Sequence, residues 1–296
     1  MSNKDYVRRF VFDQLDARGC IVSLDKASAA IQQTHYYPPN LAKLLNEFAL
    51  AAVLLHDSIK ITANVTIQLR STSNDTSLPI SLLMADCMPD RKVRAIAEYE
   101  SELLGSQATL DLSAFANIAS LAITITPEDG ERYQSIVPME HSTLAECLED
   151  YFARSEQLPT WFKFVADKEQ AMGIAVHALP AEKVKDAELS QESFSRLKIL
   201  LSSLTEDEAL QLEAQQILTR LFHEESCRLF EADSIEFGCV CSEQKSLDAI
   251  QSLGKQEVIE LLKEQQNEGQ DSLFVDCHFC FQRYEFGFTK IKELFE

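Results

Sequence analysis

The chain has 296 residues, and its 47 acidic side chains outnumber the 27 basic ones, which gives a formal net charge of −20. Such a charge repels nucleic acid phosphates and anionic lipid, so we expect no nucleic acid and no membrane among its partners. No apolar run reaches the roughly 18 residues that a bilayer span requires, and the N-terminus lacks the apolar core of a secretory signal. We therefore expect a globular protein of the cytoplasm.

The first 180 residues predict an α+β core domain, in which sheet and helix are mixed. Short strands are expected at 7–15 and 19–24, on either side of a turn at Arg18-Gly19. From Pro38 the leucines repeat at helical spacing, which predicts a helix. Further strands are expected from alternating or β-branched runs at 60–69, 80–85, 93–99, 120–126, 132–137, 160–166 and 171–179.

After Pro180 the pattern changes, and residues 181–236 predict a helical linker without a strand. Thr205 and Glu208 match a capping box between two apolar stripes at helical spacing. The stripes consist of Phe194, Leu197, Leu201 and Leu204, and of Leu210, Ile217, Leu218, Leu221 and Phe222. Such helices either pack on the core as a hairpin or detach from it, and the sequence leaves both states open.

The eight cysteines fall into two groups. Four are scattered singly and are expected to be buried free thiols: Cys20, Cys87, Cys147 and Cys227. The other four form two close pairs near the C-terminus, Cys239-Val-Cys241 and Cys277-His-Phe-Cys280. In a chain without a secretory signal, paired cysteines more often bind metal or carry out redox chemistry than brace a fold.

Residues 237–296 are therefore expected to form a small zinc-binding domain. Four thiolates suit tetrahedral Zn²⁺ and leave no open position for a reacting water, so we expect no enzyme. A hydrophobic core of roughly 60 residues is marginal, whereas structural zinc contributes about 10–16 kcal/mol of apparent folding free energy. Loss of zinc should then unfold this segment, and because zinc keeps its cysteines deprotonated, they are also oxidisable.

Two other interpretations of the cysteine pairs remain open. In the first, they form an inert structural zinc ribbon, and the chain is a constitutive adaptor that binds a fixed protein partner. In the second, Cys277 and Cys280 form a thioredoxin-like site, which requires a cysteine at a helix N-terminus, whereas residues 281–286 predict a strand. His278 could compete as a metal ligand, but a residue between two ligands is usually a spacer.

Short segments along nearly the whole chain resemble one known family. Besides the two cysteine pairs, these segments are Arg18-Gly19, Tyr37-Pro38, 121–126, 130–134, 144–152, 155–160 and 220–225. They resemble the redox-regulated chaperone family known as the thirty-three-kilodalton heat-shock protein. The most specific is the run SEQLPT at 155–160.

This resemblance implies an ATP-independent holdase, with zinc ligands at Cys239, Cys241, Cys277 and Cys280. It also implies that the reduced zinc form is inactive. Oxidation would join Cys239 to Cys241 and Cys277 to Cys280, release zinc, and unfold both the C-terminal domain and the linker. The active form would be a homodimer that binds unfolding client proteins.

The chain departs from the family pattern in two places that bear on loop geometry. Residues 70–75 stand where the family usually has a glycine-rich turn, and Phe281 stands where a glycine commonly follows the last zinc cysteine. Both changes leave the four cysteines intact, so we expect them to affect the threshold of activation rather than the metal site.

Overall fold

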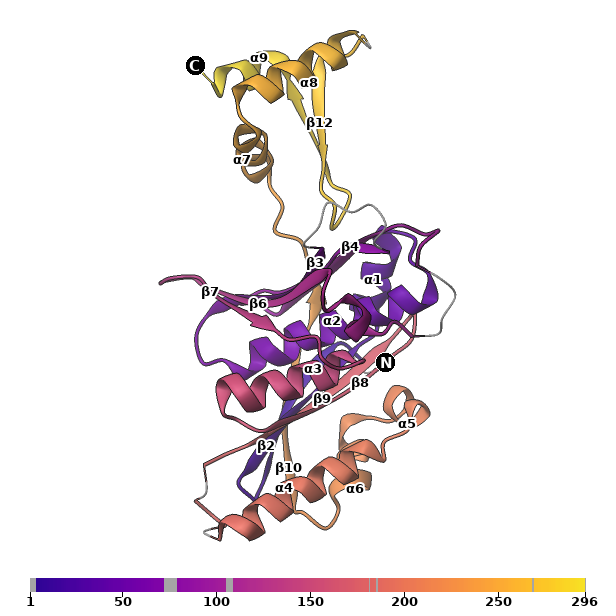
Figure 1. The fold of residues 1–296 in the computed structure, drawn as a ribbon, viewed down its shortest axis with the longest axis vertical. Helices are drawn as coiled ribbons and strands as arrows, with labels where there is room; N and C mark the ends of the chain where they lie inside the picture. Colours follow the sequence, from indigo (N-terminus) through magenta and orange to yellow (C-terminus); the bar gives the residue numbers. More distant parts are fainter. Residues whose placement is uncertain are drawn as a thin grey trace. The chain divides into compact units, whose positions relative to one another are not determined.

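The computed structural model describes residues 4–71, 79–104, 109–180, 182–184, 186–267 and 269–295. These residues form a mixed α+β fold, which confirms the predicted fold class (Figure 1). They divide into two compact units, Met1–Gly238 and Cys239–Glu296, and each is described by itself. Residues 72–75 of the expected loop departure lie outside the described residues.

The larger unit contains two sheets. The five-stranded sheet is antiparallel, with strand order β10-β1-β2-β9-β8. Its strands are β1 (Tyr6–Phe12), β2 (Ala17–Leu24), β8 (Thr160–Ala166), β9 (Ala171–Ala178) and β10 (Cys227–Ser234). The six-stranded sheet has the order β11-β5-β4-β3-β6-β7, and only β11 within it pairs in parallel. Its strands are β3 (Ala63–Ser71), β4 (Ile80–Cys87), β5 (Lys92–Tyr99), β6 (Ala119–Pro127), β7 (Tyr133–Val137) and β11 (Glu236–Phe237).

Helix α2 (Pro39–Ser58) lies between the two sheets and forms the centre of the main core (Figure 1). It contacts β3, β4 and β5 of one sheet and β2, β8 and β9 of the other, which explains why it is buried on nearly all sides. The remaining helical elements here are α1 (Lys26–Thr34), a 3₁₀ turn (Leu112–Phe115), α3 (Leu144–Tyr151) and a π turn (Phe152–Glu156). Among the helices of the described residues, none is both long and apolar enough to cross a bilayer.

The predicted linker helices form a second, separate core on the five-stranded sheet. They are α4 (Ala187–Ser202), α5 (Glu206–Gln211) and α6 (Ala214–Phe222). Their apolar residues meet one face of the sheet, where the buried side chains are Phe10, Phe12, Ile21, Val165, Met172, Ile174 and Val176. This cluster is distinct from the one around α2, so the helices and the sheet face depend on each other for burial.

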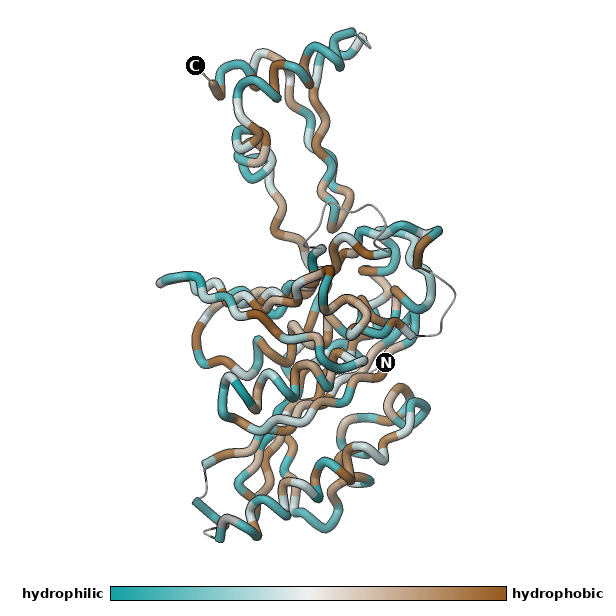
Figure 2. Tube along the Cα trace, in the orientation of Figure 1, coloured by the Kyte–Doolittle hydropathy of each residue, from teal (hydrophilic) through white to brown (hydrophobic). Residues whose placement is uncertain are grey.

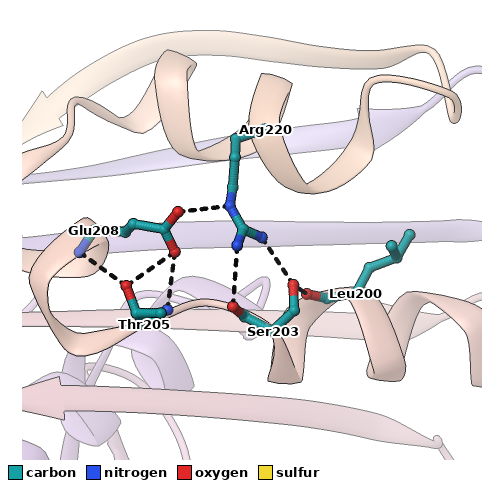
Figure 3. Close-up of polar contacts among 5 residues, drawn as sticks. All are labelled: Leu200, Ser203, Thr205, Glu208 and Arg220. Atoms are coloured by element: carbon teal, nitrogen blue, oxygen red, sulfur yellow. Dashed lines mark hydrogen bonds and ion pairs between the residues drawn. The ribbon is translucent and has the colours of Figure 1, made fainter.

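A polar network fastens the linker helices to one another (Figure 3). Thr205 and Glu208 form the predicted capping box at the start of α5. From α6, Arg220 Nε donates to Glu208 Oε1 at 2.7 Å, and Arg220 Nη1 donates to Ser203 Oγ at 2.8 Å. Arg220 Nη2 also donates to the Ser203 carbonyl at 3.2 Å, so one side chain joins the ends of all three helices.

The expectation that residues 181–236 hold no strand is wrong, because β10 and the start of β11 lie within them. β10 is an edge strand that pairs with β1, and most of its side chains face solvent. Only Cys227 and Leu229 contact the adjacent core, so the sequence shows no strong apolar alternation. Backbone pairing and the Arg8 guanidinium, which donates to the Phe230 carbonyl, hold it in place.

The smaller unit has a modest core of its own. It comprises α7 (Glu243–Leu253), α8 (Lys255–Asn267), α9 (Phe288–Glu293) and an antiparallel hairpin of β12 (Ser272–Asp276) and β13 (Arg283–Gly287). Its core is a cluster of the buried residues Leu247, Ile250, Val258, Leu262, Phe286 and Ile291. Figure 2 shows hydrophilic residues over much of α8, in keeping with a helix that buries one side only.

The expected turn at Arg18-Gly19 is wrong, because both residues lie within β2, where close packing requires the glycine. A Cβ atom at Gly19 would lie 2.3 Å from the Phe10 ring and 2.4 Å from the Ala175 carbonyl oxygen. We expect Gly19→Ala to lower the free energy of unfolding of the larger unit by about 1–3 kcal/mol, measured by urea denaturation. Gly173→Ala is the control, because its closest neighbour is the end of the Leu54 side chain at 3.1 Å. An equal loss in both variants would contradict this explanation.

Candidate metal centre

Cys277 and Cys280 lie at the tip of the β12–β13 hairpin. The Cys277 amide donates to the Gln282 carbonyl at 2.9 Å, and the Phe281 amide donates to the Cys277 carbonyl at 2.8 Å. These two bonds fold the CxxC segment into a tight turn that directs both thiols to one side. The turn follows a strand and precedes another strand, so Cys277 is not at a helix N-terminus as a thioredoxin-like site requires.

Cys239 and Cys241 lie on the extended segment that leads into α7. Ser242 caps this helix, since its Oγ accepts from the Lys245 amide at 3.2 Å. The Lys245 ammonium reaches back to the Val240 carbonyl at 2.9 Å. The CxC pair is thereby fixed against the first turn of the helix that follows it.

The structure brings all four paired cysteines together, with each sulfur within 4.8 Å of the others. Two of the distances join the two motifs: Cys239 Sγ to Cys277 Sγ is 3.5 Å, and Cys241 Sγ to Cys280 Sγ is 3.5 Å. Zn–S bonds of about 2.3 Å at tetrahedral angles place sulfur atoms about 3.8 Å apart. The donor set and its spacing therefore fit one Zn²⁺ ion, and His278 is not part of the cluster.

The electrostatics of the cluster also favour a cation. Burial raises the pKa of the Cys277 thiol, and it raises the pKa of Cys280 to about 12. A divalent cation at the centre would offset this cost, because coordination deprotonates a thiol outright. The Tyr284 hydroxyl donates to Cys241 Sγ at 3.2 Å from the neighbouring strand β13 and supports the ligand set from outside.

The four scattered cysteines take no part in this centre. Cys20, Cys87 and Cys147 are buried, as predicted, whereas Cys227 is only partly buried. Burial raises the pKa of all four, to about 12 for Cys227, so they remain protonated and unreactive at neutral pH. Within the described residues, no other group of three or more cysteine, histidine or acidic side chains is arranged to hold a metal.

Comparison with known proteins agrees with this arrangement. A family model described as Hsp33 protein matches residues 5–287 of the chain. A protein named 33 kDa chaperonin from Pseudomonas aeruginosa is 39% identical over 295 residues, which span 100% of this chain and 96% of that protein. A protein of the same name from Azotobacter vinelandii is 40% identical over 295 residues, with the same coverage. The chain belongs to the Hsp33 family.

A solved structure shows the same fold. The crystal structure of the 33 kDa chaperonin, a heat shock protein 33 homolog, from Thermotoga maritima aligns with a TM-score of 0.77. The alignment covers 98% of this chain and 97% of that one, at 23% sequence identity. At this identity the likeness extends to the fold alone.

Phe281 has a backbone conformation that favours glycine. Its φ angle is 57°, in the left-handed region that a side chain with a Cβ atom adopts at a cost of roughly 1–2 kcal/mol. The residue directly follows Cys280, so this strain lies in the turn that carries half of the metal ligands. The strained backbone is the physical reason for the expectation that a glycine would suit this position.

The hydroxyl of Tyr284 provides a test of the support around the cluster. Because second-sphere hydrogen bonds typically change metal affinity 10- to 100-fold, we expect Tyr284→Phe to weaken zinc binding by about tenfold. Competition with a colorimetric chelator measures this affinity on the reduced full-length chain. Tyr36→Phe, at an exposed tyrosine of the larger unit, should match wild type. Wild-type affinity in Tyr284→Phe would rule out the supporting role.

Phe281→Gly should stabilise the zinc-loaded C-terminal unit by about 0.5–1 kcal/mol, because relief of the left-handed strain exceeds the added freedom of glycine in the unfolded chain. Amide hydrogen exchange of β12 and β13 reports this unit separately from the rest. Phe274→Gly serves as the control, since Phe274 lies within the extended strand β12 and its removal should destabilise the hairpin. Faster amide exchange in Phe281→Gly would show that the Phe281 ring stabilises the unit by more free energy than the left-handed backbone costs.

Proposed function

We propose that this protein is a redox-regulated, ATP-independent holdase chaperone with zinc as its cofactor. In the resting state Zn²⁺ is held by Cys239, Cys241, Cys277 and Cys280. Oxidation forms the disulfides Cys239–Cys241 and Cys277–Cys280 and releases the ion. As each S–S bond forms, its two cysteine thiolates lose two electrons to one peroxide molecule, whose O–O bond breaks and which takes up two protons to leave as two waters. Membership of the Hsp33 family, whose relatives are named as chaperonins and not as enzymes, supports this function.

The observation that carries the proposal is the four-sulfur cluster in a unit with a small core. Among the residues of this unit that the structure describes, six buried side chains make up the hydrophobic cluster: Leu247, Ile250, Val258, Leu262, Phe286 and Ile291. A core of this size supplies little stability, whereas metal coordination supplies about 10–16 kcal/mol of apparent folding free energy in small domains. Oxidation of the sulfurs would therefore remove the main stabilising interaction of the unit.

The linker supplies the surface that a holdase needs. Its helices bury one apolar face of the five-stranded sheet in a cluster separate from the main core. Detachment of the helices would expose both their own stripes and the sheet face, including Phe10, Phe12 and Ile174, while α2 and its core remain intact. Both surfaces are apolar, as the binding of unfolding chains requires.

The proposal has three functional regions: a core of residues 1–180, a linker of residues 181–236 and a redox switch of residues 237–296. The activated form is a homodimer in the cytoplasm that binds partly unfolded client proteins. The strongly negative net charge keeps such a particle dispersed while apolar surface is exposed, and it disfavours nucleic acid and membrane as partners.

Light scattering from a heat-unfolding client protein tests the function. The chain is added without ATP, either reduced and zinc-loaded or treated with peroxide. We expect only the treated form to suppress aggregation, with release of one zinc ion per chain. Replacing Cys277 and Cys280 by serine should prevent zinc loading, and suppression of aggregation by this variant should no longer depend on peroxide. If neither form of the wild type suppresses aggregation, the holdase function fails, and peroxide-resistant zinc would then favour the structural adaptor.

Arg220→Met should lower the barrier to activation, because it removes the bonds from α6 to Glu208 and Ser203 and keeps the aliphatic stem. We expect the linker to lose about 0.5–1.5 kcal/mol of stability, seen as faster amide exchange in α4–α6 and faster peroxide activation. Arg154→Met is the control, since Arg154 pairs with Glu140 and Asp150 outside the linker. Equal activation rates in both variants would show that the Arg220 contacts do not control activation.

A further inference from the structure

A cavity of about 280 Å³ lies between the two sheets of the larger unit, and its lining residues belong neither to the cysteine cluster nor to the linker. This volume is close to the lower end of small-molecule pockets, which run from roughly 300 to 1,000 Å³. Its apolar walls come from the end of α2, from β3 and β6, and from the segment that follows α3: Leu55, Val65, Ile123, Ile125 and Phe152.

One positive charge faces these apolar walls. Arg18, on β2, lines the cavity and is partly buried. Among the described residues, its guanidinium makes no hydrogen bond or ion pair, whereas nearby Arg9 is paired with Asp57 at 2.6 and 2.9 Å. A guanidinium in apolar surroundings is stabilised by a planar anion that accepts two of its hydrogen bonds.

The other titratable groups of the cavity do not supply that anion. His177, the register partner of Arg18 on β9, is buried and contacts the Thr160 hydroxyl at 2.9 Å. Burial lowers the pKa of His177 to about 4, so this ring is neutral at physiological pH. Glu156 lines the exposed rim, where it accepts a hydrogen bond from the Tyr151 hydroxyl at 3.0 Å and is screened by solvent.

Arg18 also lines a second, smaller cavity of about 150 Å³, and the two cavities share Arg18, Ser58 and His177. In the smaller one, the Asp57 carboxylate is already neutralised by Arg9, and the Cys20 thiol is protonated because burial raises its pKa. The guanidinium therefore lines both cavities, of which the larger has apolar walls and the smaller includes the Arg9–Asp57 ion pair. This arrangement matches a ligand with an apolar body and a single anionic head.

We propose that this cavity binds a small monocarboxylate with an unbranched or aromatic apolar body, with its carboxylate on Arg18 and its body against Val65, Ile123 and Ile125. The site belongs to the folded core and does not depend on the oxidation state of the cysteines. The ligand class follows from the charge of Arg18, the neutral state of His177 and the apolar character of the walls.

The test uses octanoate as the probe on the reduced, zinc-loaded full-length chain, below the concentration at which octanoate forms micelles. Isothermal titration gives the affinity, and methyl NMR of the isoleucines locates the site. We expect saturable binding of one octanoate per chain, with shifts concentrated at Ile123 and Ile125. The carboxylate of octanoate can form a charge-assisted, bidentate contact with Arg18, whereas the hydroxyl of 1-octanol cannot. Octanoate should therefore bind at least about tenfold more tightly than 1-octanol.

Variants separate the charge of Arg18 from a general effect of charge. Arg18→Gln should weaken octanoate binding at least about tenfold and leave 1-octanol unchanged, whereas Arg18→Lys should keep part of the preference. Arg70→Gln removes the same charge from an exposed position on β3 and should bind as wild type.

Three results would each overturn the proposal. They are equal affinity for octanoate and 1-octanol in the wild type, tighter binding of octylamine than of octanoate, and shifts that map to the linker face instead of Ile123 and Ile125. If Arg18→Gln does not fold, the comparison of the three probes on the wild type and on Arg18→Lys still decides the outcome.

Discussion

The C-terminal unit depends on holding four cysteine sulfur atoms within 4.8 Å of one another. Four thiolates at this spacing repel each other, and four thiols form only weak hydrogen bonds, so a shared cation is the condition under which the arrangement is stable. The interleaved contacts, Cys239 with Cys277 and Cys241 with Cys280, join the segment before α7 to the β12–β13 hairpin. Loss of these contacts would therefore separate the segment before α7 from the hairpin.

The three hydrophobic clusters explain how such a change can stay local. The cluster around α2 is enclosed by both sheets and shares no side chain with the cluster under the linker helices, or with the one in the C-terminal unit. Free energy of unfolding is then distributed unevenly, with a stable centre and two separable parts. The same enclosure by two sheets leaves room near Arg18, because strands that diverge around a helix do not fill every gap with side chains.

Much of this structure could be predicted from the sequence where the signal is local. Helical spacing from Pro38 gives α2, alternation gives most strands, and Thr205 with Glu208 gives the start of α5. The paired cysteines of the sequence are the ones that cluster in the structure, in an arrangement that could hold a metal ion. The expectation that position 281 suits a glycine agrees with the φ angle of 57° at Phe281.

The features that sequence reasoning missed depend on distant partners. Helix α1 begins without a cap of its own, because the Asp5 carboxylate accepts from the amides of Asp25 and Ala27 across the fold. β10 is stabilised by backbone pairing to β1 and not by an apolar pattern. The Tyr284 hydroxyl reaches Cys241 only because the hairpin and the CxC segment meet in space, and nothing in the sequence near either residue indicates this contact.

The short segment from β10 to β11 has a mechanical consequence. β10 is paired with β1 of one sheet, β11 with β5 of the other, and Ile235 between them is fully buried in the main core. The chain is thus paired with both sheets before it reaches Cys239, the first of the four clustered cysteines. Unfolding that starts at the four cysteines would first have to separate β11 from β5 and remove Ile235 from the main core. It would then have to break the pairing of β10 with β1, one residue pair at a time, before it reached Phe222 at the end of α6. Because these steps follow one another, they would delay the spread of unfolding from the cysteines to the linker helices. A brief disturbance at the cysteines would then end before these helices were released.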